Sequence, residues 1–181
     1  MGKIISETYI SVDIEASGPI PEEYSMLSVG ACVVGKKSAT FYSELKPIND
    51  KFVASALEVS GFSLEKLKQE GTEPAAAMAH FEEWALKVCG NFRPVFVGFN
   101  ASFDWMFTHY YFLKFLGRDP FGISGIDIKA YFMGKLNTSW GETTKKRVAA
   151  QFTPSTKHTH NALDDAVEQA EIFEKLLMFK G

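Results

Sequence analysis

The sequence predicts a single α/β domain over residues 1–181, in which helices flank a mixed sheet. Three observations indicate this class. Strand-like segments come first along the chain, and helical segments then alternate with short apolar strands. The length of 181 residues suffices for one substantial core but not for two ordinary domains. Hydrophobic residues make up 46% of the chain and charged residues 23%, as in soluble globular proteins.

Charge and cysteine content exclude several classes of protein. A net charge of −3 excludes an overall basic nucleic-acid binder, but it allows a locally basic groove beside an acidic, metal-filled site. The two cysteines, Cys32 and Cys89, suggest neither a zinc site nor a disulfide framework, so we expect a reducing, cytoplasmic location. The chain shows no secretory segment and no apolar run long enough to cross a bilayer, so we expect no membrane partner.

The first three predicted strands form an antiparallel meander. Tyr9–Glu15 is rich in β-branched and aromatic residues, and Met26–Val34 is a second apolar stretch. We expect a turn at Gly35-Lys36-Lys37 and a third strand over Thr40–Leu45.

Two carboxylates stand at the C-terminal end of the first strand. Side chains alternate along a strand with a period of two, so Asp13 and Glu15 project from the same face. Two like charges side by side repel, and a bound divalent cation such as Mg²⁺ is the simplest compensation. The alternative is that both residues merely begin an exposed turn before Gly18-Pro19. The strand alone leaves both interpretations open.

From residue 53 onward the apolar residues recur mostly at helical spacing, with short strands between the helices. The stretch Asn137–Thr159 is polar and mixed, and no element is predicted there. The expected elements are, in order, a short helix from Val53 ended by Gly61, a helix over Ser63–Gln69, a helix opened by Glu73-Pro74, a strand over Pro94–Phe99, a helix over Ser102–Leu116, a strand over Ile126–Ile128, a helix over Lys129–Leu136 and a last helix over Asn161–Phe179.

A functional acid is expected where the apolar strand Pro94–Phe99 ends and a helix begins. All-apolar strands are buried on both faces of an α/β sheet, and sites in open sheets lie beyond the carboxyl ends of the strands. Asp104 falls in the first turn of the following helix. The alternatives are that Asp104 only complements the helix dipole and that Asn100 is only a turn residue or a cap.

The start of the last helix holds another candidate acid. At about 100° per residue, Asp164 points toward Glu168 and Glu171, which we expect on a solvated face. Asp165 lies instead at the edge of the apolar face, where a partly desolvated carboxylate needs a cation or a donor. His160, just ahead of the helix, is the candidate proton acceptor, and the alternative is a surface histidine.

Together, Asp13, Glu15, Asp104, His160 and Asp165 form a pattern that resembles the DEDDh 3′–5′ exonucleases. This group belongs to the ribonuclease H-like superfamily and includes ribonuclease T, oligoribonuclease and the polymerase III proofreading subunit. The strand with D-x-E, the N-x-x-F-D segment at 100–104 and the H-x-x-x-x-D segment at 160–165 look like the three motifs of the family. The resemblance covers nearly the whole chain.

Two departures from the family pattern leave the choice of substrate open. The family often has a histidine before the asparagine of its second motif, where this chain has Phe99. It often has Thr-Thr-Gly or Ser-Thr-Gly after D-x-E, where this chain has Ala16-Ser17-Gly18. Neither departure removes an expected metal ligand.

The resemblance implies a ribonuclease H-like fold and hydrolysis of phosphodiester bonds from the 3′ end of single-stranded RNA or DNA. It also implies two divalent ions, Mg²⁺ or Mn²⁺, held by Asp13, Glu15, Asp104 and Asp165, with His160 accepting the proton of the attacking water. Two rival hypotheses are a catalytically silent nucleic-acid-binding scaffold of the same fold and a metal-dependent nucleotide phosphohydrolase.

Several further residues are candidate substrate contacts. Met26 or Leu27 could wedge against the last base, although a buried strand position is the alternative. A basic run, Lys145, Lys146, Arg147 and Lys157, could contact phosphates or simply be solvated. The expected contacts near the scissile bond are the backbone of Ala16, Ser17 and Gly18 at the terminal ribose, together with Asn100 and Phe103.

Aromatic residues occupy every side of the helix expected over Ser102–Leu116. A helix without a polar face is either deeply buried or packed against another subunit. The sequence therefore predicts core packing combined with a homodimer interface.

Overall fold

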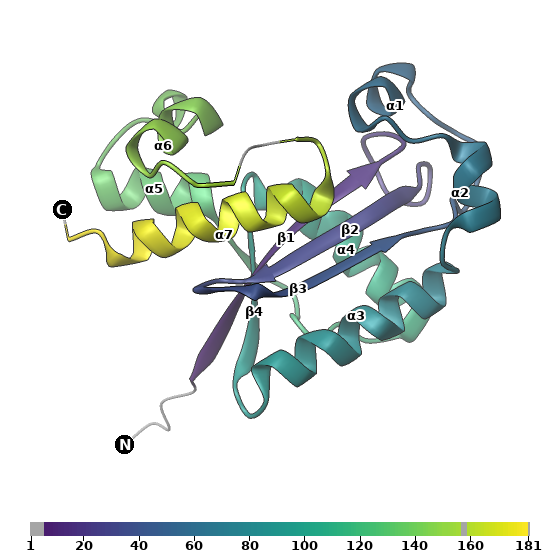
Figure 1. Cartoon of the computed structure of the whole chain (residues 1–181), viewed down its shortest axis with the longest axis horizontal. Coiled ribbons are helices and arrows are strands. Elements are labelled where there is room, and N and C mark those ends of the chain that lie inside the picture. The colour runs from purple at the N-terminus through teal and green to yellow at the C-terminus, as the bar shows by residue number, and fades with distance from the viewer. Residues whose placement is uncertain (1–5, 157–158, 181) are drawn as a thin grey trace.

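The computed structural model describes residues 6–156 and 159–180, and within them one five-stranded sheet has the order β3-β2-β1-β4-β5 (Figure 1). β1 pairs antiparallel with β2, and β2 with β3, whereas β1 pairs parallel with β4, and β4 with β5. The predicted mixed sheet with an antiparallel meander is confirmed. The strands are β1 (Glu7–Ala16), β2 (Met26–Val33), β3 (Lys36–Glu44), β4 (Arg93–Gly98) and β5 (Gly125–Asp127).

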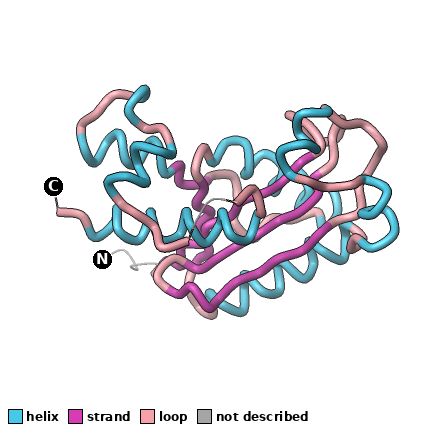
Figure 2. Tube along the Cα trace, turned by 45° about the horizontal axis from the view of Figure 1, so that its top comes forward, coloured by secondary structure: helices cyan, strands magenta, loops and turns pink. Residues whose placement is uncertain are grey.

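Helices cover both faces of this sheet (Figures 1 and 2). α3 and α4 pack on one face, and α7 crosses β1 and β2 on the other. The helices are α1 (Ala54–Ser60), α2 (Leu64–Glu70), α3 (Pro74–Cys89), α4 (Ala101–Leu116), α5 (Ile128–Leu136), η1 (Trp140–Glu142, a 3₁₀ turn), α6 (Lys145–Gln151) and α7 (Ala162–Met178). In the part of the chain that the structure describes, no helix is long and apolar enough to span a membrane.

β1 shows how alternation in the sequence becomes a two-faced strand. Ile10, Val12 and Ile14 are buried in the cluster that α3 and α4 close. Asp13 and Glu15 lie on the opposite face, toward α7, because successive side chains point to opposite sides. The central position of β1 between β2 and β4 makes it a rigid support for both acids.

The prediction is wrong about one turn and about one segment without predicted elements. The hairpin turn is at Val34 and Gly35, with Gly35 at φ 80°, and Lys36 already pairs with Val33. The stretch Asn137–Thr159 contains η1 and α6, although no element was predicted there. α6 is short, and packing of Val148 on α5 and α7 stabilises it, which its polar sequence does not reveal.

The face of α7 that carries Glu168 and Glu171 is buried, so the prediction of a solvated face is wrong. The side chains of both residues are at most 6% exposed. Lys37 pairs with Glu171 at 2.5 Å, and Ser155 N–H donates to the same carboxylate at 2.6 Å. Burial alone would raise the pKa of Glu171, but these donors lower it to about 2.

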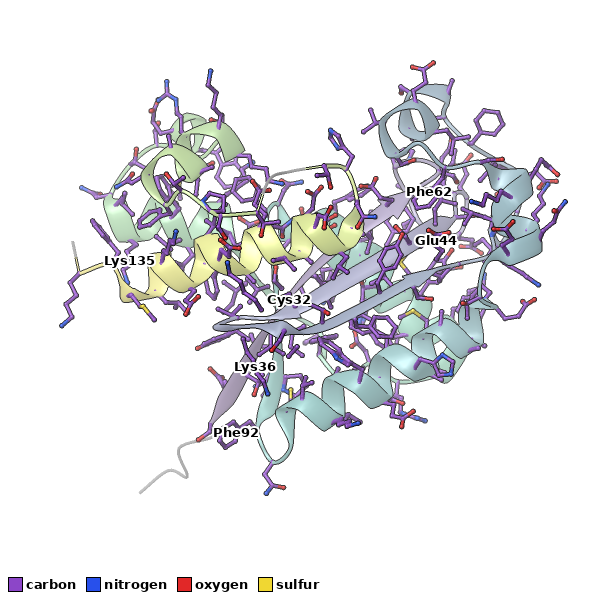
Figure 3. All side chains as sticks on the ribbon, in the orientation of Figure 1. Cys32, Lys36, Glu44, Phe62, Phe92 and Lys135 are labelled. Carbon is purple, nitrogen blue, oxygen red and sulfur yellow. The ribbon has the colours of Figure 1, made fainter. Side chains whose placement is uncertain are left out.

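Two further lysines form hydrogen bonds that join α7 to α5 and to the loop after α6. Lys135 donates to the carbonyl of Leu177 at 3.0 Å, close to the end of α7 (Figure 3). Lys175 donates to the carbonyl of Thr153. These bonds hold α5, α6 and the following loop against the helix that bears the last predicted acid.

Cysteine and aromatic side chains are mainly core components. Cys32, which lies in β2 (Figure 3), and Cys89 are both buried free thiols. Burial raises the pKa of the Cys32 thiol to about 11. On α4, Phe107, Tyr111 and Phe112 are fully buried, whereas Leu113 is 45% exposed. Core packing therefore accounts for much of the apolar character of α4, and the homodimer stays a prediction.

Gly30 lets α7 approach the sheet at the level of the acids. It pairs with Asp13 across β1 and β2. A Cβ atom at residue 30 would lie 2.2 Å from the carbonyl carbon of Ala162 and 2.3 Å from the backbone nitrogen of Leu163. Because backbone atoms cannot swing aside as a flexible side chain can, any larger residue must push the start of α7 away from β2.

We predict that Gly30→Ala lowers the free energy of unfolding by about 2 kcal/mol through this overlap and also reduces activity by displacing Asp165. Gly134→Ala is the matched control, because that glycine is exposed within α5 and its Cβ would meet open space. Urea unfolding should show a lower free energy of unfolding for Gly30→Ala than for wild type, and no decrease for Gly134→Ala. Equal stability of Gly30→Ala and wild type would contradict the close approach of α7.

Candidate active site

A pocket of about 240 Å³ lies where β1 ends and where α4 and α7 begin. The structure brings all the predicted catalytic residues, Asp13, Glu15, Asp104, His160 and Asp165, to its wall. The remaining lining residues are Ile14, Phe99, Asn100, Phe103, Lys145 and Gln169.

Asp13 stands at the centre of the acidic group. Burial, followed by repulsion from Asp104, Asp165 and Glu15, holds its pKa well above the ordinary value. Burial, followed by repulsion from Asp165, likewise raises the pKa of Glu15 to about 7. These shifts arise mainly because the carboxylates are buried, and repulsion between them adds to the effect of burial.

Asp104 reaches back from α4 to the first strand. Its side chain is 5% exposed, and its Oδ1 accepts a hydrogen bond from the backbone N–H of Ile14 at 3.0 Å. Burial raises its pKa to about 7 although this hydrogen bond favours the ionised form. Asp104 therefore does more than complement the dipole of α4.

The two neighbouring aspartates of α7 lie in different surroundings, as the helical spacing predicts. Asp165 is 1% exposed, lines the pocket and accepts from the backbone N–H of Thr159 at 3.0 Å. Asp164 is more exposed and accepts from the hydroxyl of Thr159 at 2.8 Å. Asn161 caps the helix through its side chain, which fixes the start of α7.

His160 has an exposed side chain and a left-handed backbone, with φ 57°. Non-glycine residues rarely adopt this conformation, and such strain concentrates at functional positions. Ligand atoms of Glu15, His160 and Asp165 lie within 4.8 Å of one another. His160 therefore lies beside two of the predicted metal ligands. His158 and Lys157 lie outside the described residues.

The donor set fits divalent cations of the Mg²⁺ or Mn²⁺ type. Carboxylate oxygens are the ligands that such hard ions prefer. Burial and, to a smaller extent, repulsion from neighbouring carboxylates raise the pKa values of Asp13, Glu15 and Asp104, and a bound cation would favour their ionised forms.

A second pocket, of about 480 Å³, adjoins the acids through Glu15. Of the predicted substrate contacts, Ala16, Gly18 and Phe103 line it, whereas Asn100 lines the acidic pocket. Its far wall comes from α1, which sequence reasoning did not connect with the site. The sequence shows only that Val53 and Val59 are apolar, whereas the structure shows that they are 36% and 54% exposed beside the site.

Three predicted substrate contacts require correction. Met26 and Leu27 are 0% exposed and belong to separate core clusters, so neither can wedge against a base. Ser17 is also fully buried. Its backbone N–H donates to Ser25 and its carbonyl accepts from Val53, so its role is to fix the loop after β1.

Gln169 is a site residue that sequence reasoning missed. It is 1% exposed, and its Nε2 donates to Asp13 Oδ1 at 2.6 Å. Its Oε1 accepts from the backbone N–H of Phe99 at 2.8 Å. Gln169 therefore fixes the carboxylate of Asp13 relative to the end of β4. The available signal was an amide one helical turn after Asp165, at the edge of an apolar face.

Comparison with known proteins identifies the family. A family model described as an exonuclease, RNase_T, matches residues 10–173. The chain belongs to this exonuclease family. The 3′–5′ DNA exonuclease Cap18 of Escherichia coli is 49% identical to it over 168 residues, which are 92% of this chain and 90% of the relative.

Solved structures show the same fold at low sequence identity. The nuclease domain of 3′hExo, a DEDDh family member bound to rAMP, aligns with a TM-score of 0.78 at 15% identity, over 98% of this chain and 94% of that one. Escherichia coli exonuclease I in complex with a dA16 oligonucleotide aligns with a TM-score of 0.73 at 15% identity, over 97% of this chain and 42% of that one. The predictions of a ribonuclease H-like fold and of a DEDDh-type 3′–5′ exonuclease are confirmed.

The raised carboxyl pKa values predict that the metal-free protein becomes less stable as pH rises. Glu15 and Asp104 shift from ordinary values of 4.5 and 3.8 to about 7, so between these limits the folded chain binds more protons than the unfolded chain. The free energy of unfolding therefore falls through this window. The lowered pKa of Glu171 acts in the opposite sense, but only below its ordinary value of 4.5.

Urea unfolding in EDTA at pH 5 and pH 7.5 measures this effect. Stability should be lower at pH 7.5, and added Mn²⁺ should restore it. Asp104→Asn should flatten the pH dependence. A metal-free protein that is more stable at pH 7.5 than at pH 5 would contradict the site electrostatics.

Proposed function

We propose that this exonuclease degrades single-stranded DNA from its 3′ end, with two Mg²⁺ or Mn²⁺ ions held by Asp13, Glu15, Asp104 and Asp165. The observation that carries the proposal is the convergence of these carboxylates from β1, α4 and α7 on one pocket. DNA is favoured over RNA because the relative at 49% identity is a DNA exonuclease. RNA is the second candidate, since the 3′hExo domain of the same fold holds rAMP.

The reaction is hydrolysis of the last phosphodiester bond. Water attacks the phosphorus, the bond to the 3′ oxygen of the preceding nucleotide breaks, and a nucleoside 5′-monophosphate leaves a strand with a new 3′ hydroxyl. Paired ions would activate the water and stabilise charge on the attacking and leaving oxygens. His160 accepts the proton of the water, and its place next to Glu15 and Asp165 supports that role.

The apolar pocket beyond Glu15 receives the terminal nucleoside. Ala16 and Gly18 are small, so the sugar can approach the end of β1 closely. The ring of Phe103 offers a stacking surface, and stacking accepts any base because every base has a π face. α1 forms the opposite wall. These features support binding of a strand end without selection for sequence.

The cytoplasmic location, the homodimer and the extent of the domain over residues 1–181 stay predictions. The observation on α4 that favours a homodimer is the exposed side chain of Leu113, which a second copy of the chain could cover.

The substrate proposal predicts a ladder that shortens from the 3′ end when 5′-labelled single-stranded DNA is incubated with Mg²⁺. RNA of the same sequence should be shortened more slowly, and addition of EDTA should stop both reactions. A 3′ phosphate on the DNA should block its degradation if the terminal hydroxyl enters the pocket. Faster shortening of the RNA would reverse the substrate assignment, and intact strands with Mg²⁺ and with Mn²⁺ would contradict the proposal.

The metal-ligand proposal predicts opposite outcomes for two adjacent residues of α7. Asp165→Ala should lower kcat by about a thousandfold or more, since it removes a buried metal ligand. Asp164→Ala is the matched control and should retain most activity, because Asp164 does not line the pocket. Steady-state rates on the labelled DNA decide between them. A dead Asp164→Ala beside an active Asp165→Ala would overturn the assignment.

A further inference from the structure

Lys145, the first residue of α6, brings a positive charge into the acidic pocket. It lines the same pocket as the predicted catalytic residues. Its ammonium lies 2.8 Å from Glu168 Oε2, and the two side chains are 26% and 6% exposed. Asp165 and Glu168 are three residues apart on α7, so they lie on neighbouring parts of one helix face.

The ammonium acts electrostatically on the acids themselves. Although burial dominates and raises the pKa of Asp13, Glu15 and Asp104, the charge of Lys145 lowers the pKa of each of them. Lys145 lines one small pocket together with these acids, which places its ammonium close to the group as a whole. A phosphate held over the same acids would therefore also lie near the ammonium.

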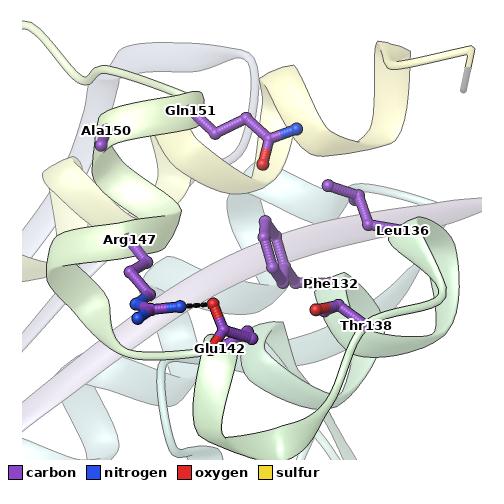
Figure 4. Close-up of a pocket in the computed structure, with 7 residues that line it drawn as sticks. All are labelled: Phe132, Leu136, Thr138, Glu142, Arg147, Ala150 and Gln151. Atoms are coloured by element: carbon purple, nitrogen blue, oxygen red, sulfur yellow. Dashed lines mark ion pairs between the residues drawn. The ribbon is translucent and has the colours of Figure 1, made fainter.

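The neighbours of Lys145 point elsewhere. Lys146 is exposed. Arg147 turns into a recess between α5 and α6, where it pairs with Glu142 (Figure 4). Of the basic residues that the structure describes in this stretch, Lys145 alone lines the acidic pocket.

Glu168 explains how the ammonium stays in place. Burying a carboxylate is costly unless a cation or donors compensate it, and here the partner is supplied by a different helix. The pair joins α6 to α7 beside the site. The result is a fixed cation where a flexible lysine would otherwise sample many positions.

We propose that Lys145 is a catalytic residue that donates a hydrogen bond to a non-bridging oxygen of the scissile phosphate, and that Glu168 is its positioning residue. This inference rests on the proposed function. An ammonium carries three N–H donors, so it can keep its ion pair with Glu168 while it donates to the phosphate. Its charge opposes the negative charge that the phosphate bears during hydrolysis, as lysines do at other phosphate sites.

The alternative is that Lys145 only compensates the acids in the metal-free protein. The two roles differ in their consequences for metal binding. A fixed cation repels a metal ion, so a purely compensating lysine could be removed with tighter Mn²⁺ binding and an unchanged kcat. A phosphate-binding lysine cannot be removed without loss of rate.

The experiment compares Lys145→Met with Lys146→Met as the matched control. Steady-state kinetics on 5′-labelled single-stranded DNA at saturating Mg²⁺ give kcat and KM, and calorimetry gives the Mn²⁺ dissociation constant. We expect Lys145→Met to lower kcat about tenfold to a hundredfold, as for loss of one charged hydrogen bond, with Mn²⁺ binding unchanged or tighter. Lys146→Met should stay within about twofold of wild type, as surface changes do.

Two more variants secure the result if Lys145→Met does not fold. Lys145→Arg keeps the charge and should retain part of the rate. Glu168→Gln frees the ammonium and should lower kcat while thermal melting shows a folded protein. Wild-type kcat in Lys145→Met, or in Glu168→Gln, would overturn the corresponding role. A lost rate that excess Mn²⁺ restores would also overturn the phosphate contact. An inactive wild type would instead reject the proposed function.

Discussion

The carboxylates of Asp13, Asp104 and Asp165 share one pocket, and much of the surrounding structure holds them there. Burial and mutual repulsion oppose this arrangement, as the raised pKa values of Asp13 and Asp104 show. Hydrogen-bond donors to each carboxylate offset part of this cost. They are Gln169 for Asp13, the backbone N–H of Ile14 for Asp104 and that of Thr159 for Asp165. These donors thus hold the carboxylates of the proposed metal site in one pocket.

α7 is the helix in which most of these constraints meet. Its first turn rests directly on the backbone of Gly30, opposite Asp13, so the level of Asp165 is set by contact with the sheet. Its buried carboxylates bind different parts of the chain. Glu168 pairs with Lys145 at the pocket, and Glu171 accepts hydrogen bonds from Ser155 and Thr156 in the loop after α6. The helix is therefore a core element and a support for the site at once.

Much of the fold could be predicted, because the patterns involved are local. Alternation in β1 and helical spacing in α3 and α7 follow from which side chains must avoid water. Elements that depend on distant partners were missed or misplaced. α6 is too short and polar to be recognised, and it forms because Val148 packs on α5 and α7. The sequence suggests Met26 and Leu27 as substrate contacts. Both are buried instead, because the loop after β1 and Tyr111 of α4 enclose this part of β2.

The sequence by itself determined which acids face the same way. A period of two places Asp13 and Glu15 together, and a period of 3.6 separates Asp165 from Asp164. Only the tertiary structure decided which residues surround those acids. Gln169, Lys145 and Glu168 lie at the site because α7 contacts β1 and the end of β4, and because the Lys145–Glu168 pair joins α6 to α7. Periodicity reports the face of an element, whereas the partner that meets this face depends on how elements far apart in the chain come together.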